Sequence, residues 1–167
     1  ERILGKGIVC AKDTPNFVGN RIGVQGMVNA IQMMVADGLS IPEVDALFGS
    51  VMGRPKTAMF KTADLVGLDV LAHVAKNTYD LVENDEVRDS FVMPEFVNTM
   101  IEKKLLGKKT QGGFYKTDLT PEWQKIRKVI DPATLEYAEY EFASFPCLEA
   151  AIKAQTLSEK MRAVGYG

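Results

Sequence analysis

The sequence of 167 residues predicts an all-α, multi-helix domain of five to seven helices, with a short extended segment at its start. Apolar residues recur at steps of three and four through most of the chain, which places them on one face of an α-helix. Ser40-Ile41-Pro42-Glu43 is a capping box with proline in the first helical turn. The length suffices for one domain with a real core, or for one domain plus an appendage.

The first residues predict an extended connector and then a turn. Residues 7–11 are apolar, include β-branched side chains and lie between two lysines, which is typical of a strand or an extended connector. In residues 13–16 a proline fixes φ, and Asp and Asn side chains can bond to nearby backbone. We therefore expect the first long helix to begin between Phe17 and Asn20.

This first helix should end near Ala36, with Gly38 as a left-handed cap. Gly19, Gly23 and Gly26 lie in its first half, although each costs about 1 kcal/mol relative to alanine in a helix. The three glycines indicate close approach by another backbone or by a ligand. For Gly26 we favour the alternative, tight helix–helix packing.

The middle of the chain predicts short helices separated by glycine and proline. The helix that opens at Ser40 should end near Gly53. Pro55 then breaks the chain, and a helix restarts near Thr57. Gly67 separates this helix from the next one.

Beyond residue 94 the pattern predicts a helix, a loop and a weakly patterned segment. The helix starts at Pro94, ends at Gly107 and is followed by a basic, glycine-rich loop at residues 108–115. A short helix is expected at 120–126, and the rest of 118–144 reads as irregular chain. A final amphipathic helix should start at Pro146.

Composition excludes several classes of protein. The formal net charge is −2 and the pI about 5.5, so bulk charge does not indicate nucleic acid or an anionic membrane as partner. No apolar run approaches the ~20 residues of a membrane span. Cys10 and Cys147 match no metal or redox spacing, which favours reduced thiols and a cytoplasmic setting. The chain starts in mid-pattern at Glu1, so we expect a piece of a longer polypeptide.

The titratable residues do not assemble into a known catalytic set. His73 is the only histidine, and its place within a helix favours a structural role. Asp64 and Asp69 lie on either side of Gly67, so they do not share a helix face and are expected to be caps. No metal-ligand spacing and no dinucleotide-binding glycine motif is present. The loop at 108–113 could hold a phosphate, although a solvated basic loop explains it as well.

Three motifs follow one another along the chain. The first is Lys12-Asp13-Thr14-Pro15-Asn16-Phe17-Val18-Gly19-Asn20-Arg21. The second is Gly53-x-Pro55, then Phe60, then Asp64-Leu65-Val66-Gly67-Leu68-Asp69. The third is Gly107-x-Lys109-Thr110-x-x-Gly113-Phe114-Tyr115. In this order they resemble the C-terminal domain of L-3-hydroxyacyl-CoA dehydrogenases, whose first motif reads Asp-x-Pro-Gly-Phe-x-x-Asn-Arg.

Two departures from the family pattern refine the resemblance. Asn16 replaces the usual Gly, and residues 56–58 stand where the family usually has Met-Gly-Pro. The second departure resembles the branch in which the dehydrogenase is fused to an enoyl-CoA hydratase. Residues 131–137 and the helix after Pro146 resemble that branch's connector towards the hydratase.

The resemblance implies a fold like the C-terminal domain of 6-phosphogluconate dehydrogenase and an enzyme of β-oxidation that oxidises 3-hydroxyacyl-CoA with NAD. The family's site lies between two domains, and its histidine, glutamate and serine come from the NAD-binding domain, which is not in this chain. Asn20 matches the family's active-site asparagine, and Lys109 matches a lysine that contacts NAD. Pro55 and Phe60 fall where the family lines the acyl-chain cleft. No metal is implied.

The resemblance also divides the chain into three parts. Residues 1–12 would be the connector or strand from an upstream NAD-binding domain, 13–116 the helical domain, and 117–167 a C-terminal extension, second helical subdomain or linker. Expected partners are 3-hydroxyacyl-CoA, the NAD-binding domain, a downstream hydratase domain and a second copy in a homodimer. The fragment alone should be inactive.

Two alternatives stay open on sequence. One is a non-catalytic helical oligomerisation module, which is favoured by the departure from the family pattern at residues 56–58. The other is the helical domain of a different two-domain NAD(P) dehydrogenase, of the 6-phosphogluconate or glycerol-phosphate type. The order Asp-x-Pro…Asn-Arg argues against the latter.

Overall fold

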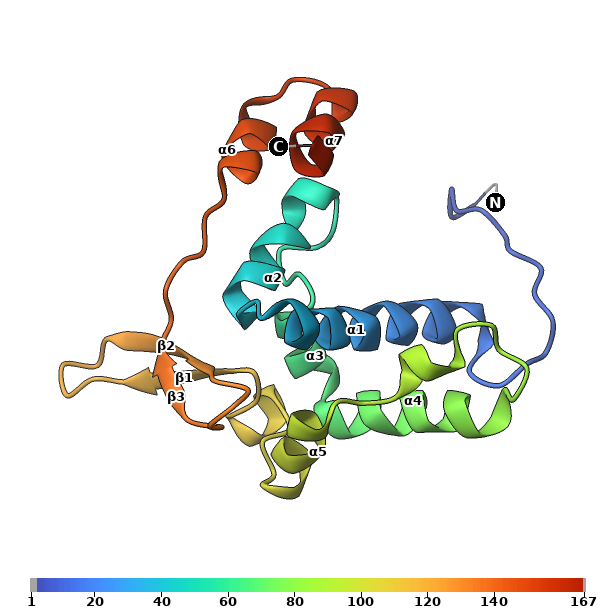
Figure 1. Ribbon diagram of the computed structural model, residues 1–167, viewed down its shortest axis with the longest axis horizontal. Coiled ribbons are helices and arrows are strands. Elements are labelled where there is room, and N and C mark those ends of the chain that lie inside the picture. The colour runs from blue at the N-terminus through green and yellow to red at the C-terminus, as the bar shows by residue number, and fades with distance from the viewer. Residues whose placement is uncertain (1–2, 167) are drawn as a thin grey trace.

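The computed structural model describes residues 3–166 and confirms a helical domain (Figure 1). Its α-helices are α1 (Phe17–Asp37), α2 (Ile41–Leu47), α3 (Phe60–Val66), α4 (Leu68–Leu81), α5 (Glu95–Glu102), α6 (Pro146–Lys153) and α7 (Leu157–Tyr166). Short 3-10 helices are η1 (Ser50–Met52), η2 (Arg88–Phe91) and η3 (Lys108–Thr110). The strands are β1 (Tyr115–Leu119), β2 (Lys125–Ile130) and β3 (Tyr137–Glu139).

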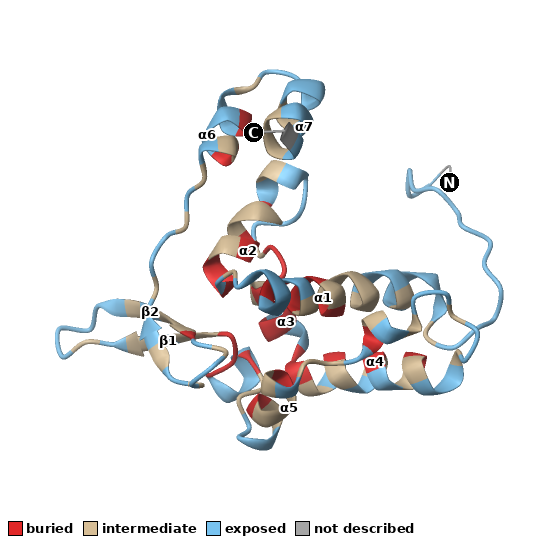
Figure 2. Cartoon of the chain, in the orientation of Figure 1, coloured by how far each residue is buried: buried red, intermediate tan, exposed pale blue. Residues whose placement is uncertain are grey.

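The core forms where α1, α3, α4 and α5 meet the start of the sheet. Helices α1 and α4 lie side by side, and Figure 2 shows buried residues on the faces that they turn towards each other and around α3. Val28, Ile31 and Met34 supply the buried face of α1, and their steps of three explain why that face is continuous. Phe60 and Phe114 meet edge to face at 4.7 Å between ring centroids.

Local signals placed the end of α1 and the start of α2 correctly. Gly38 follows α1 with φ 66°, and its N–H donates to the Met34 carbonyl, as expected of a left-handed cap. The capping box is present, since the backbone N–H of Ser40 donates to the Glu43 carboxylate at 2.7 Å. The helix it opens is shorter than expected, because α2 ends at Leu47 and η1 continues the chain.

The prediction for residues 118–144 was wrong, because this segment holds a sheet rather than a short helix and irregular chain. Its strands are antiparallel in the order β1-β2-β3, with Tyr115 opposite Val129 and Ile130 opposite Tyr137. The strands are short and rich in charge, so their alternation is weak in the sequence. The turn that joins β1 and β2 holds Trp123 at φ 62°, where a helix could not form.

The C-terminal helix was also expected to be single, but the chain forms two. Helices α6 and α7 pack against each other beyond an extended segment, 140–145 (Figure 1). They are separated by a second capping box, in which the Thr156 N–H donates to Glu159 at 3.0 Å and the Glu159 N–H donates to the Thr156 hydroxyl at 3.2 Å.

The segment before α1 has no strand within the described residues. Ile8 and Val9 are 72% and 79% exposed, so this segment is the extended connector rather than part of a sheet. Across residues 3–166, none of the helices combines the length and the apolar character that a membrane-spanning helix requires.

Candidate functional site

Asn20 lies on the first turn of α1 with its side chain exposed. None of the hydrogen bonds among residues 3–166 involves its amide, so the group is free to bond to another molecule or domain. A Cβ added at Gly23 or Gly26 would meet nothing within 4 Å. The expectation that Gly26 serves helix–helix packing is therefore wrong inside this chain, and the glycines leave one face of α1 open.

Asn16 explains how the chain enters α1. Its φ is 63°, in the left-handed region that glycine adopts most easily and asparagine tolerates best among the other residues. Its side-chain amide donates to the Val74 carbonyl at 3.2 Å and to the Thr78 hydroxyl at 2.7 Å. Asparagine thus replaces the family's glycine without losing the turn, and it ties the start of α1 to α4.

Arg21 connects the start of α1 to the loop that follows α4. Its guanidinium forms an ion pair with Asp85, with Nε donating at 2.9 Å. The pKa of Asp85 is lowered, first by the hydrogen bond from the Val87 N–H and then by Arg21. The loop after α4 is therefore held against the first turns of α1, beside Asn20.

Asp64 joins the second motif to the third. Its two carboxylate oxygens accept the backbone N–H groups of Phe114 and Tyr115, each at 2.8 Å. A Cβ at Gly113 would lie 2.5 Å from the Cα of Gly107, so both glycines are needed for this close approach. The prediction that Asp64 is a helix cap is wrong. It is a buried acceptor, and burial raises its pKa to about 6.

Asp69 holds Lys109. The lysine Nζ lies 2.5 and 2.6 Å from the two oxygens of Asp69, and this hydrogen bond is the main cause that lowers the pKa of that carboxyl. Gly67 precedes α4 with φ 99°, and a Cβ there would lie 3.0 Å from the Lys109 ammonium. Asp69 is the second residue of α4 rather than its cap, so that prediction is also corrected.

The structure keeps Asn20 and Lys109 apart. The entry to α1 is bonded to Thr78 in the last turn of α4, whereas Lys109 is bonded to Asp69 in its first turn. Those two positions are nine residues apart in α4, which is about 14 Å along the helix axis. The two predicted contact residues are therefore associated with opposite ends of α4.

The other predicted residues have different surroundings. Pro55 is exposed in the turn before α3. Phe60 is 1% exposed and packs in the core, so its ring offers no surface to a ligand. His73 is exposed on α4, and no cluster of three or more His, Cys, Asp or Glu side chains suited to a metal occurs among residues 3–166.

Asp45 is a buried carboxylate that the sequence did not single out. It is 6% exposed and accepts the backbone N–H groups of Met59 and Phe60 at 2.9 and 2.7 Å. The Tyr115 hydroxyl donates to it at 2.9 Å. Its only signal in the sequence is an acidic residue on the apolar side of a short helix. Its role is to anchor the start of α3.

Comparisons with known proteins match this geometry to one family. The model of the C-terminal domain of 3-hydroxyacyl-CoA dehydrogenase matches residues 17–117. A probable 3-hydroxyacyl-CoA dehydrogenase of Bacillus subtilis is 46% identical over 166 residues, which is 99% of this chain and 20% of the relative. One of Deinococcus radiodurans is 47% identical over 116 residues, covering 70% of this chain and 33% of the relative.

Two further matches widen the comparison. A putative fatty acid oxidation complex trifunctional enzyme of Rickettsia prowazekii is 31% identical over 81% of this chain and 19% of its own length. The crystal structure of FadB2 of M. tuberculosis superposes with a TM-score of 0.58 at 31% identity, over 69% of this chain and 39% of that chain. The chain thus spans a third or less of the curated relatives described here.

Proposed function

This chain belongs to the 3-hydroxyacyl-CoA dehydrogenase C-terminal domain family, and on that premise we propose that it is the substrate-side half of an NAD-dependent dehydrogenase acting on 3-hydroxyacyl-CoA. The observation that carries the proposal is Asn20, an exposed amide without an intramolecular partner among residues 3–166, beside an open glycine face. Such a surface suits a site that is completed by another domain.

Asn20 has the chemistry of a positioning group that touches substrate. An amide donates and accepts hydrogen bonds without titrating, so it can orient the 3-hydroxyl and the group that takes its proton. In this proposal the general base belongs to the adjoining domain, as the family resemblance implies, because His73 does not match the family's histidine. The Asn16 and Arg21 contacts hold the helix turn that carries Asn20.

Lys109 fits the contact with NAD. Its ammonium is bonded to Asp69, yet 46% of the lysine side chain is exposed. It can therefore contact a polar or anionic group of a dinucleotide that is held mainly by another domain. NAD, when bound there, supplies the hydride acceptor for oxidation of the 3-hydroxyl. Pro55 stays a candidate for the acyl-chain side, whereas the burial of Phe60 supports only a core role.

The proposal also includes the remaining partners. Trifunctional relatives support a hydratase or further domain fused to this one. Phe17, Val18 and Ile22 are exposed apolar residues in the first two turns of α1, which supports an apolar contact with a second domain or a second copy in a homodimer. We also propose a cytoplasmic location and a division of the chain at residues 12 and 116, and the family match over residues 17–117 supports the second boundary.

The test compares the isolated chain with the full-length protein that contains it. We expect the chain, given NAD and 3-hydroxybutyryl-CoA, to produce no rise in NADH absorbance, and the full-length protein to produce one. Turnover by the isolated chain that is abolished by Asn20→Ala would refute the proposal that this chain holds only half of the active site. An Asn20→Ala variant of the full-length protein with unchanged rate but altered oligomer size would favour the oligomerisation module.

A further inference from the structure

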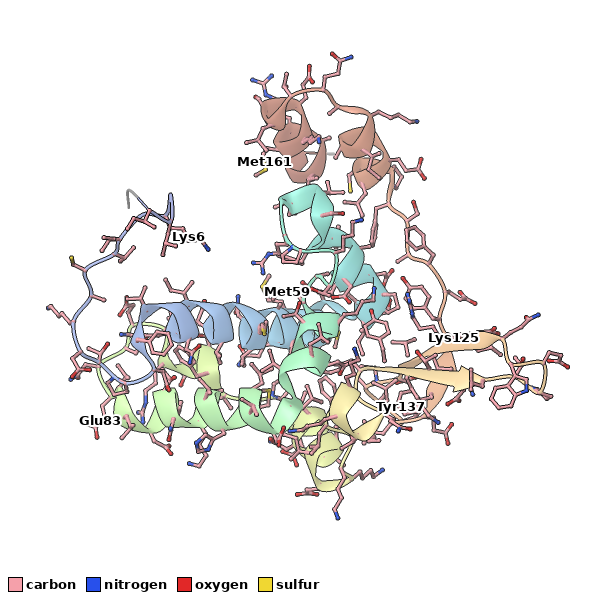
Figure 3. All side chains as sticks on the ribbon, turned by 180° about the vertical axis from the view of Figure 1, so that it is seen from behind. Lys6, Met59, Glu83, Lys125, Tyr137 and Met161 are labelled. Carbon is pink, nitrogen blue, oxygen red and sulfur yellow. The ribbon has the colours of Figure 1, made fainter. Side chains whose placement is uncertain are left out.

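A further groove of the domain has neither Asn20 nor Lys109 in its lining. It lies between α3 and the β1–β2 hairpin and has a volume of about 600 Å³. Figure 3 views this region from behind, with Met59 just before α3 and Lys125 at the start of β2. The volume falls within the range of small-molecule sites, roughly 300–1,000 Å³.

The groove is lined by an excess of positive charge. Lys61, Lys108 and Arg127 are among its lining residues, with Lys116 beside them. Within residues 3–166, neither Lys108 nor Arg127 forms an ion pair, whereas Lys116 is bonded to Asp118 at 2.9 Å. Two cations are therefore without an acidic partner at this surface.

The acidic residues nearby do not cancel this charge. Asp64 is the only acid that lines the groove, and both of its oxygens accept backbone N–H groups. Asp45 lies 3.9 Å from the Lys61 ammonium but already accepts three hydrogen bonds.

Aromatic rings hold the cations in place. The Lys61 ammonium lies 5.0 Å from the centre of the Tyr115 ring and 5.6 Å from that of Tyr140. The Arg127 guanidinium lies 5.5 Å from the centre of the same Tyr140 ring. Ring faces attract a cation without using its N–H groups, so these donors are left for an anion.

We propose that this groove is a binding site for an organic phosphate of nucleotide size that carries two or more phosphate groups. Two phosphates can engage Arg127 and the lysines together, and charge-assisted hydrogen bonds from Arg to phosphate are bidentate. The proposal rests on the groove alone and not on the proposed dehydrogenase function. Two sources share this chemistry, the phosphorylated end of coenzyme A and a nucleoside diphosphate.

The experiment is isothermal titration calorimetry of the full-length protein with adenosine 3′,5′-bisphosphate, ADP and inorganic pyrophosphate. We expect saturable binding that weakens when salt rises from about 0.05 to 0.3 M. Arg127→Gln and Lys108→Gln should each weaken binding about three- to tenfold. Lys103→Gln, a matched loss of one exposed lysine outside the groove, should change the Kd less than twofold.

The order of affinity among the three probes identifies which of the two phosphate-bearing molecules the groove binds. Tighter binding of the 3′,5′-bisphosphate indicates the coenzyme A end, and tighter binding of ADP indicates a nucleoside diphosphate. An absence of saturable binding by all three probes would overturn the site, as would equal weakening by Lys103→Gln. Arg127-dependent binding in a protein without dehydrogenase activity would uphold the groove while refuting the proposed function.

Discussion

The carboxylate of Asp64 accepts the backbone N–H of Phe114 at 2.8 Å, across fifty positions of sequence. With the contacts of Asp69 and Lys109, this bond makes the second and third sequence motifs one structural unit. The glycines of these motifs, Gly67, Gly107 and Gly113, are needed because backbone and side chains approach them closely. Several motif residues therefore have a structural role that their resemblance to an enzyme family does not reveal.

The pH dependence of stability should report the burial of Asp64. Its pKa in the fold is raised to about 6 from 3.8, so the folded state binds more protons than the unfolded state between these values. The contribution of Asp64 to the free energy of unfolding should therefore fall by about 2–3 kcal/mol as pH rises from about 4 to 7.

Urea unfolding of wild type and Asp64→Asn across this pH range isolates the contribution of Asp64. The contributions of the other carboxylates are the same in both proteins and cancel when the two free energies of unfolding are subtracted. The asparagine variant loses one of the two N–H acceptors, so it should be the less stable protein at about pH 4. The difference in the free energy of unfolding between the two proteins should become smaller towards neutral pH. A gap that stays constant or widens contradicts the raised pKa.

Two glycine variants should move stability in opposite directions. Gly113→Ala would place a Cβ 2.5 Å from the Cα of Gly107, and should destabilise the domain by about 2 kcal/mol or more. Gly26→Ala meets nothing within 4 Å in α1, and should stabilise it by about 1 kcal/mol through helix propensity. Thermal unfolding of both variants measures the contrast, and equal effects would speak against the packing described.

Asn16 should be replaceable by glycine at lower cost than by alanine. Both variants lose the bonds to Val74 and Thr78, but only alanine is strained by the φ of 63° that this position requires. We expect Asn16→Ala to cost about 2 kcal/mol and Asn16→Gly about 1 kcal/mol in the free energy of unfolding. Denaturant titration tests the order, and a more stable alanine variant would exclude the left-handed turn.

Replacing Lys109 should weaken the binding of NAD more than it lowers the stability of the domain. Its ion pair with Asp69 is half-exposed, and exposed pairs contribute about 1 kcal/mol or less. In the full-length protein, Lys109→Met should raise the KM for NAD about tenfold with little change in the unfolding midpoint. Lys103→Met serves as the control, and an equal rise of KM there would remove Lys109 from the cofactor contact.

Local chemistry made parts of the fold predictable. The capping box at Ser40 and the glycine cap at Gly38 each involve residues only a few positions apart, so the sequence was enough to place them. The sheet was missed because Lys125–Ile130 carries three cations and gains its stability from pairing with distant strands. Asp64 was misassigned because its partners lie on another element.

The candidate site was predictable only in part. Asn20 and Lys109 came from the resemblance, since an exposed asparagine carries no signal of its own in composition or periodicity. The loop at 108–113, which by its composition could hold a phosphate, supplies Lys108 and Gln111 to the groove. The rest of the groove could not be predicted, because Lys61 and Arg127 meet at Tyr140 only through the pairing of β2 and β3 and the packing around α3.

The most direct test of the half-site is the rate of the full-length protein with Asn20→Ala, measured with 3-hydroxybutyryl-CoA and NAD. Asn20 is exposed and unbonded among residues 3–166, so its loss should leave the unfolding midpoint unchanged. We expect kcat/KM to fall on the order of 10²-fold, with Asn29→Ala in the same helix near the wild-type rate. A wild-type rate in the Asn20→Ala variant would contradict the account.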